Sequence, residues 1–140
     1  MPPARYAAQH FTFEAWGVSS SLLMNAQALE SILLRAVKLA GLRPIGAPSS
    51  AVILDDGKAW GAGASSLQLL IDSHASLHGL AQRGHVYCDI FSCASLDSEL
   101  LAANLSWWLG ATDFSWRVRD RTIGRSWWRW LPTWWRRLLR

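Results

Sequence analysis

The sequence predicts an α+β protein built as a two-layer α/β sandwich, an antiparallel sheet with two helices on one face. Segments with strand-like alternation interleave with two amphipathic helical segments along the chain. Several strands are neighbours joined by short turns, which favours an antiparallel over a parallel sheet. With 140 residues, 51% of them hydrophobic and 17% charged, the chain suits one domain with one core and is not disordered.

Three segments with period-two or strongly β-prone sequence predict strands, and two short apolar runs accompany them. The three segments are residues 10–16, 85–93 and 112–119, and the two runs are residues 51–54 and 66–71. Elsewhere we expect a loop of small residues at 17–21, and a polar segment at 72–78 that ends in a turn at 79–84.

Two helices are predicted from apolar residues that recur at three-to-four spacing. The first covers about residues 27–42, with its charged side chains off the apolar face. The second covers about residues 97–109, with Ser95 or Asp97 as its N-cap and Gly110 as its stop. Helices of this kind bury one face, so both are expected to cover the sheet.

Basic charge is concentrated near the C-terminus. Eight of the 14 Lys and Arg residues lie from Arg117 onward against one acid, Asp120, so the last 24 residues carry +7 and the preceding 116 carry −3. Eight of the ten tryptophans lie in the same third of the chain. We therefore divide the chain into a domain over residues 1–120 and a Trp/Arg-rich tail over 121–140. The tail is expected to pack on the domain or a subunit, or to contact a membrane surface, and no nucleic-acid partner is expected.

No apolar run reaches the ~18 residues of a membrane-spanning helix, and the N-terminus lacks a secretory signal, so we expect a cytoplasmic protein. Cys88 and Cys93 lie five residues apart on a predicted strand, which points their side chains to opposite faces. A disulfide between them is therefore not expected, and both are interpreted as reduced thiols. Their pattern does not match a zinc site either, so no metal is expected.

The segment Ser73-His74-x-x-x-His78 is the first candidate for chemistry. Taken alone, it also fits two histidines in a loop. A serine hydrolase is disfavoured because no Gly-x-Ser-x-Gly motif surrounds Ser73. A zinc site is disfavoured because the two histidines lack a third ligand at metal spacing.

The wider pattern is more specific than this segment. Residues spaced along the chain resemble the bacterial and archaeal S-adenosylmethionine decarboxylase proenzymes over about residues 8–119, without a gap between Ser65 and Cys93. The matching positions are His10, Glu14, Ser65, Asp72-Ser73-His74-x-x-x-His78, Asp89-Ile-Phe-Ser-Cys93 and Leu109-Gly110-Ala111. The Trp/Arg-rich tail lies outside the resemblance.

The resemblance implies that the chain cuts itself between Asp72 and Ser73. The Ser73 hydroxyl would attack the Asp72 carbonyl and convert the amide to an ester, with Ser65 at the family's position for a processing donor to the oxyanion. Loss of the Ser73 α-proton would then expel the Asp72 carboxylate, and His78 matches the processing base. Hydrolysis of the resulting dehydroalanine would leave a pyruvoyl group in place of Ser73.

The resemblance also implies a pyruvoyl-dependent decarboxylase of polyamine (spermidine) biosynthesis, working as a homo-oligomer of cleaved chain pairs on a small-molecule substrate. The pyruvoyl ketone derived from Ser73 would form a Schiff base with the substrate amine, and Cys93 matches the proton donor to the product. Cys88 has no family counterpart and is interpreted as core. A pyridoxal cofactor is disfavoured because Lys38 and Lys58 are the only lysines and both are expected to be exposed.

Three departures from the family bear on the substrate. Gln82 stands where the family has a ribose-binding glutamate, Trp60 lies one residue after the position of an adenine-stacking aromatic, and Asp72 replaces glutamate before the scissile bond. S-adenosylmethionine is the first expectation. Ornithine or arginine is the alternative, with a carboxylate such as Asp55, Asp56 or Asp89 binding the distal cation. A further alternative is a non-catalytic homologue whose tail binds a membrane or a partner.

Overall fold

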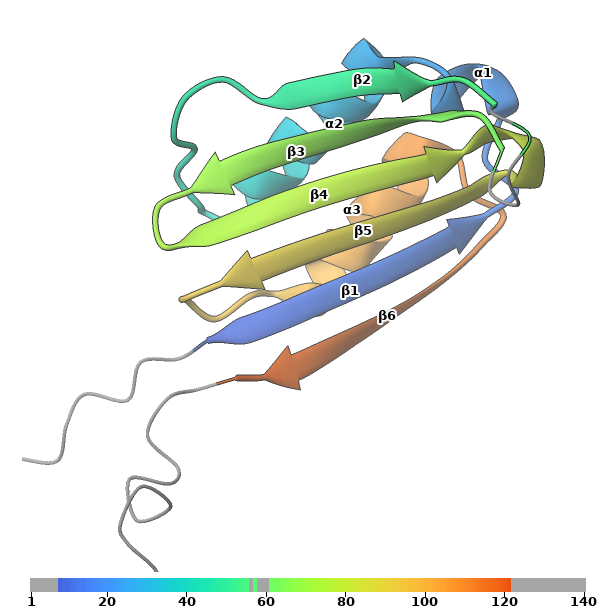
Figure 1. The fold of residues 1–140 in the computed structure, drawn as a ribbon. Coiled ribbons are helices and arrows are strands. Elements are labelled where there is room, and N and C mark those ends of the chain that lie inside the picture. Colours follow the sequence, from blue (N-terminus) through green and yellow to red (C-terminus); the bar gives the residue numbers. More distant parts are fainter. Residues whose placement is uncertain (1–7, 56, 58–60, 122–140) are drawn as a thin grey trace, which may run out of the picture.

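A computed structural model describes residues 8–55, 57 and 61–121, which form a six-stranded sheet backed by helices (Figure 1). The strands are β1 (Gln9–Trp16), β2 (Ser49–Ile53), β3 (Gly63–Leu70), β4 (Ser73–Leu80), β5 (His85–Ser92) and β6 (Asp113–Asp120). Their order across the sheet is β2-β3-β4-β5-β1-β6, and every neighbouring pair is antiparallel. The predicted fold class, an α+β sandwich with an antiparallel sheet, is confirmed.

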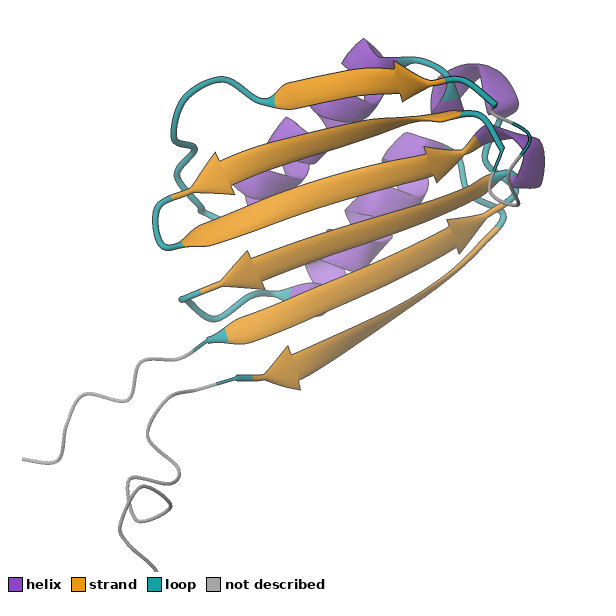
Figure 2. Ribbon diagram, in the orientation of Figure 1, coloured by secondary structure: helices purple, strands orange, loops and turns teal. Residues whose placement is uncertain are grey.

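Two long helices lie side by side on one face of the sheet (Figure 2). The helices are α1 (Ser20–Leu23), α2 (Ala26–Leu39) and α3 (Ser98–Leu109), with a 3-10 turn, η1 (Ala81–Arg83), after β4. The sequence predicted α2 and α3 but expected a loop where the short helix α1 begins. A four-residue helix has no apolar period to detect, and its only cap is the Ser19 hydroxyl, which accepts from the Leu22 amide at 3.4 Å. No helix in the described part of the chain is long and apolar enough to cross a bilayer.

The helix ends are fixed by side-chain caps. The Asn25 carboxamide oxygen accepts from the Ala28 amide at 3.0 Å and starts α2. The Asp97 carboxylate accepts from the Leu100 amide at 3.0 Å, so Asp97 rather than Ser95 is the N-cap of α3. Gly110 ends α3 in the left-handed conformation, with φ of 62°.

The prediction for residues 72–84 was wrong, because residues 73–80 form the central strand β4 and only the residues after it form a turn. Ala75, Leu77 and Gly79 are its buried residues. A Cβ on Gly79 would lie 3.0 Å from a methyl group of Leu23, so glycine at this position lets α1 pack on the strand. Two of these three inward residues are small, so the sequence does not show the alternation of large apolar and polar residues that is typical of a strand.

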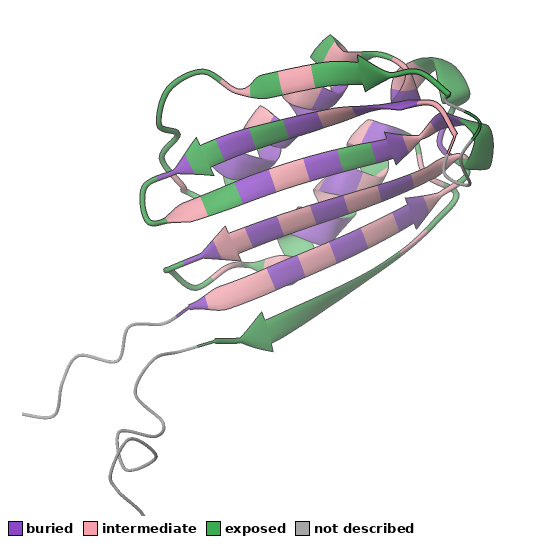
Figure 3. Cartoon of the chain, viewed as in Figure 1, coloured by how far each residue is buried: buried purple, intermediate pink, exposed green. Residues whose placement is uncertain are grey.

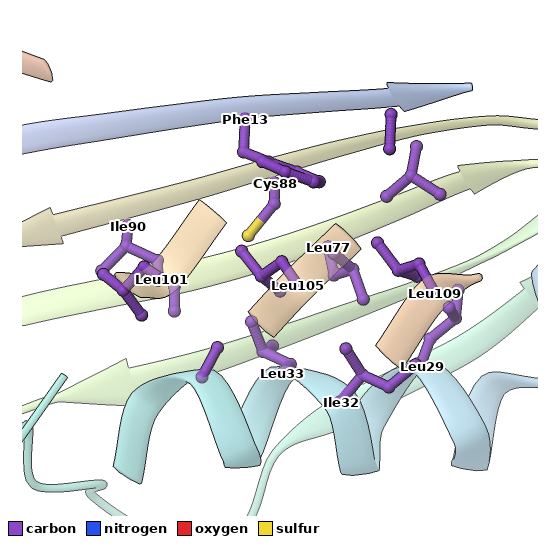
Figure 4. Close-up of a cluster of buried hydrophobic side chains, with 14 of the residues drawn as sticks. Phe13, Leu29, Ile32, Leu33, Leu77, Cys88, Ile90, Leu101, Leu105 and Leu109 are labelled. Carbon is purple, nitrogen blue, oxygen red and sulfur yellow. The ribbon is translucent and has the colours of Figure 1, made fainter. Parts of the chain in front are cut away.

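The core lies between the sheet and the two long helices. Along β1 and β5, buried residues alternate with partly exposed ones, as Figure 3 shows. The buried side chains from the strands and helices meet in one cluster (Figure 4). Its labelled members are Phe13, Leu29, Ile32, Leu33, Leu77, Cys88, Ile90, Leu101, Leu105 and Leu109.

The other face of the sheet, called the open face below, carries no helix in the described part of the chain. The strand alternation places the chain's four histidines on this face: His10, His74, His78 and His85. Ser65 and Asp89 share this face with them. Most of the candidate residues therefore stand on the side of the sheet that the helices leave uncovered.

Candidate active site

The predicted cleavage site lies in the tight turn between β3 and β4. Leu70 pairs with Ser73, so Ile71 and Asp72 form a two-residue turn. Asp72 has φ of 57° and is the one non-glycine residue in the described part of the chain with a positive φ. The left-handed region costs an L-residue roughly 1–2 kcal/mol, so the peptide bond before Ser73 follows a strained residue.

Cys93 contacts both sides of this peptide bond. Its thiol donates a hydrogen bond to the Asp72 carbonyl oxygen at 2.9 Å. Its backbone amide donates to the Ser73 hydroxyl oxygen at 3.2 Å. The structure therefore brings together Asp72, Ser73 and Cys93, three of the residues predicted for the site.

The turn is also anchored to the segment after α2. The Ile71 amide donates to the Arg43 carbonyl at 3.0 Å, and the Ile45 amide donates to the Leu69 carbonyl at 2.8 Å. A small cavity of about 210 Å³ opens beside the turn. It is lined by Gly41, Leu42, Arg43, Ile71, Asp72, Ser73, Cys93 and Ala94. Both partners of the predicted cleavage bond thus border a space open to a ligand.

A second polar cluster lies on the open face. Ser65 and His78 are cross-strand partners on β3 and β4, and the Ser65 hydroxyl is hydrogen bonded to His78 Nδ1 at 2.9 Å. They line a larger cavity of about 410 Å³, together with Tyr87 and Asp89 from β5. Its other lining residues are Ile53, Gly61, Gly63, Gly79 and Leu80. Asp89 also lies 3.1 Å from Nε2 of His10, between carboxylate oxygen and ring nitrogen.

The two clusters do not meet within one chain. Ser73 and His78 are five residues apart on β4, a separation of roughly 16 Å along a strand. An odd separation also puts their side chains on opposite faces of the sheet. The sequence placed these residues in one constellation, but the structure places them at two sites.

The residues predicted to bind the substrate lie near the larger cavity or outside the described residues. Trp60 and Asp56 lie outside them. Gln82 stands in η1, and its amide donates to the Asp55 carboxylate at 2.8 Å. This hydrogen bond, followed by one from the Gly57 amide at 2.9 Å, lowers the pKa of Asp55. A Cβ on Gly61, which lines the cavity, would collide with the Gln82 carboxamide, so Gln82 lies against a residue of the cavity wall.

The two cysteines differ in environment. Cys88 is 1% exposed in the core, and burial raises the pKa of its thiol. Cys93 is exposed, one residue beyond the end of β5. Both thiols are free. Among the described residues, no group of three or more His, Cys, Asp or Glu side chains is close enough to hold a metal ion.

The fold is an α+β domain. At its β3–β4 turn, Ser73 is hydrogen bonded to Cys93 next to the left-handed residue Asp72. A family model for S-adenosylmethionine decarboxylase matches residues 9–122. The chain belongs to the S-adenosylmethionine decarboxylase family, and the resemblance seen in the sequence is confirmed.

Two relatives illustrate the relationship. The S-adenosylmethionine decarboxylase proenzyme of Methanococcus maripaludis is 27% identical over 85 residues, which cover 61% of this chain and 64% of that protein. The chain thus matches less than two thirds of that curated relative. The crystal structure of the adenosylmethionine decarboxylase from Aquifex aeolicus matches with a TM-score of 0.65 and 23% identity, over 84% of this chain and 92% of that one. At this identity the match shows a shared fold.

Proposed function

We propose that the chain is the proenzyme of a pyruvoyl-dependent decarboxylase of S-adenosylmethionine, which acts in polyamine biosynthesis and cleaves itself between Asp72 and Ser73. The observation that carries the proposal is the contact of Cys93 with both the Asp72 carbonyl and the Ser73 hydroxyl. A residue that touches the nucleophile and the electrophile of one peptide bond favours reaction at that bond. The left-handed Asp72 adds strain that cleavage would release.

In the first step the Ser73 hydroxyl oxygen bonds to the Asp72 carbonyl carbon, and the carbon–nitrogen bond of the amide breaks. The hydroxyl proton passes to the released amine of Ser73. In the second step a base removes the Ser73 α-proton, the bond from Cβ to oxygen breaks, and Asp72 leaves as a carboxylate. Water then converts the remaining dehydroalanine to a pyruvoyl group and releases ammonia.

We propose that a second copy of the chain supplies the processing base. His78 and its partner Ser65 lie on the open face, roughly 16 Å along the strand from Ser73 of the same chain. A two-fold axis between two facing sheets, perpendicular to their strands, sets the turn end of one β4 against the opposite end of the other. Such a homo-oligomer brings His78 and Ser65 of one copy toward the β3–β4 turn of the next, where Ser73 stands at the end of its sheet.

The residues around position 73 fit a pyruvoyl group, because Ser73 lies beside a cavity and its hydroxyl accepts from the backbone amide of Cys93, whose side chain is an exposed thiol. When formed, the group supplies a ketone that captures the substrate amine and withdraws electrons as carbon dioxide leaves. Cleavage separates the Asp72 carbonyl from the Cys93 thiol. The freed thiol is then available to donate a proton to the product carbon.

The larger cavity is the proposed site for the nucleoside part of the substrate. Gln82, which lies against the cavity residue Gly61, would bind ribose hydroxyls, and Asp55 beside it adds the negative charge that glutamine lacks. An ionised acceptor forms stronger hydrogen bonds to hydroxyl groups than a neutral one. We also propose that Trp60 stacks on the base. The tail over 121–140 is proposed to act in association rather than in cleavage, because the processing residues all precede it.

Trapping of labelled carbon dioxide from carboxyl-labelled S-adenosylmethionine tests this function. The wild-type protein should release the label, and Ser73→Ala should release none because alanine has neither the nucleophile nor the leaving group. Release from ornithine or arginine with none from S-adenosylmethionine would overturn the proposed substrate.

A further inference from the structure

We propose that the Trp/Arg-rich tail packs on its own domain and covers an apolar strip along the edge strand β6. The strip consists of Phe114, Trp116 and Val118 and is called the β6 strip below. Residues 122–140 of the tail lie outside the described residues. This packing gives the association proposed for the tail a definite surface, and it would hold whether or not the chain cleaves itself.

The β6 strip continues the core of the domain beyond the cover of the helices. Trp116 pairs with Phe13, and Val118 pairs with Phe11. Cross-strand partners share a face, so the strip lies on the helix-bearing face of the sheet. Phe11 and Phe13 are buried, whereas the two strip residues opposite them are each 39% exposed. Figure 3 shows β6 exposed along nearly its whole length. Neighbouring exposed apolar residues are typical of a surface that another segment covers.

The tail begins beside the β6 strip. The Arg121 amide donates to the Ala8 carbonyl at 2.6 Å, so the pairing of β6 with β1 extends to Arg121. The Arg121 guanidinium lies 5.3 Å from the centre of the Phe91 ring, a cation–π contact that holds this residue in place. The 19 residues that follow span up to roughly 60 Å when extended, while the eight residues of β6 are roughly 27 Å long. The tail is therefore long enough to run back along the whole strip.

The composition of the tail matches the surroundings of the strip. Those 19 residues include nine Trp, Leu or Ile residues and five arginines, with no acid. The end of β6 where the tail begins is acidic, because Asp120 ends β6 while Asp97 caps α3 and Glu99 lies in its first turn. The two elements meet there, since the Leu96 amide donates at 2.8 Å to the side chain of Gln9, the strand partner of Asp120. A basic and apolar segment is thus matched by an apolar strip with an acidic rim.

The open face of β6 would repel the tail instead. It carries Arg117 and Arg119, which pair with Thr12 and His10 of β1. Both arginines are exposed, and their charges have the same sign as those of the tail. Charge therefore distinguishes the two faces of one strand. The tail is expected on the helix-bearing face, opposite to the face on which a second copy is proposed to dock.

Limited chymotrypsin digestion of the full-length chain tests this packing, because the enzyme cuts after the tail's Trp and Leu residues only while they are detached. Val118→Lys removes an apolar contact and adds a like charge, so its tail should be cut about tenfold faster than the wild-type tail. Ser115→Lys is the matched control, because it adds the same charge to the open face of the same strand. Its tail should be cut at the wild-type rate. Cuts after Phe13 or Leu33, followed by mass in the same digest, report unfolding of the domain.

A second variant keeps the test decisive if Val118→Lys loosens the domain. Glu99→Lys reverses one charge of the acidic rim on an exposed residue of α3. It should raise the rate of tail cutting about threefold at low salt, and the difference should vanish at about 1 M salt. Asp113→Lys reverses a charge at the opposite end of β6 and should leave the rate unchanged.

The outcomes identify what covers the strip. Slow cutting of the wild-type tail, independent of protein concentration, with faster cutting of Val118→Lys, supports packing on the same chain. Protection that grows with protein concentration would place the tail on a second copy and overturn the proposal. Protection seen only with vesicles that contain anionic phosphatidylglycerol would place it on a membrane and also overturn the proposal. So would a wild-type tail that is cut as fast as the tails of Val118→Lys and Glu99→Lys. None of these results depends on cleavage before Ser73.

Discussion

When two inactive variants are made in the same cell, one of them should restore cleavage of the other. His78→Ala keeps Ser73 but lacks the proposed base, and Ser73→Ala keeps His78 but lacks the nucleophile. Because His78 lies roughly 16 Å along β4 from its own Ser73, it cannot reach that residue by hydrogen-bond distance. If His78 is the base, it must come from another copy, and a mixed oligomer then holds one intact His78 beside one intact Ser73.

The expected yield follows from random assembly. If the oligomer is a dimer, the commonest soluble assembly, equal amounts of the two variants give roughly half mixed dimers. Each mixed dimer brings the intact His78 of the Ser73→Ala chain to the intact Ser73 of the His78→Ala chain. Roughly half of the His78→Ala chains should therefore be cleaved, and none of the Ser73→Ala chains.

Intact mass after co-expression, with a different affinity tag on each variant, measures both populations in one sample. His78→Ala expressed alone is the first control and should remain largely uncleaved. A second control combines both substitutions in one chain and co-expresses it with His78→Ala, so that no copy carries the base. Cleavage of His78→Ala alone at the wild-type level, or no cleavage in the mixture, would refute the assignment of His78 in trans.

Three further predictions follow from the structure. In the native protein a thiol reagent should modify Cys93 and spare Cys88, because burial shields the Cys88 thiol and raises its pKa. Equal labelling of both cysteines, measured by mass, would contradict the packing of β5. Gly63→Ala should lower the free energy of unfolding, measured in urea, by about 3 kcal/mol, because a Cβ at residue 63 would collide with the Gly79 carbonyl. An unchanged midpoint of urea unfolding would contradict the close approach of β3 and β4. Asp55→Asn should raise KM for S-adenosylmethionine about threefold with kcat little changed, whereas Glu99→Gln on α3, a matched loss of charge, should change neither.

Much of the fold could be predicted from the sequence because its elements have clear periods. The helix that begins near Ala26 shows a three-to-four spacing of apolar residues, and the strand from Gln9 shows an alternating one. Gly110 indicates a helix end, because glycine readily adopts the left-handed conformation found there. The central strand β4 could not be predicted in the same way. Its inward side chains include Ala75 and Gly79, which are small, and Gly79 lies where Leu23 of helix α1 packs against the strand.

The residues of the candidate site could be singled out from the sequence, but their arrangement could not. The family resemblance singled out Ser73, His78 and Cys93 as candidates, and the register of β4 and β5 brings Cys93 to the turn as a near neighbour of Ser73. Spacing alone does not say on which face of a sheet a residue lies until the segment is known to be a strand. Once β4 is recognised, an odd separation of five residues places His78 on the open face, away from Ser73.

The mass of the purified full-length protein tests the central claim most directly. Cleavage between Asp72 and Ser73 predicts two fragments of 72 and 68 residues, the second carrying a pyruvoyl group in place of its N-terminal serine and resisting N-terminal sequencing. A single mass of the intact 140-residue chain after prolonged incubation, with an unmodified Ser73, would contradict the account.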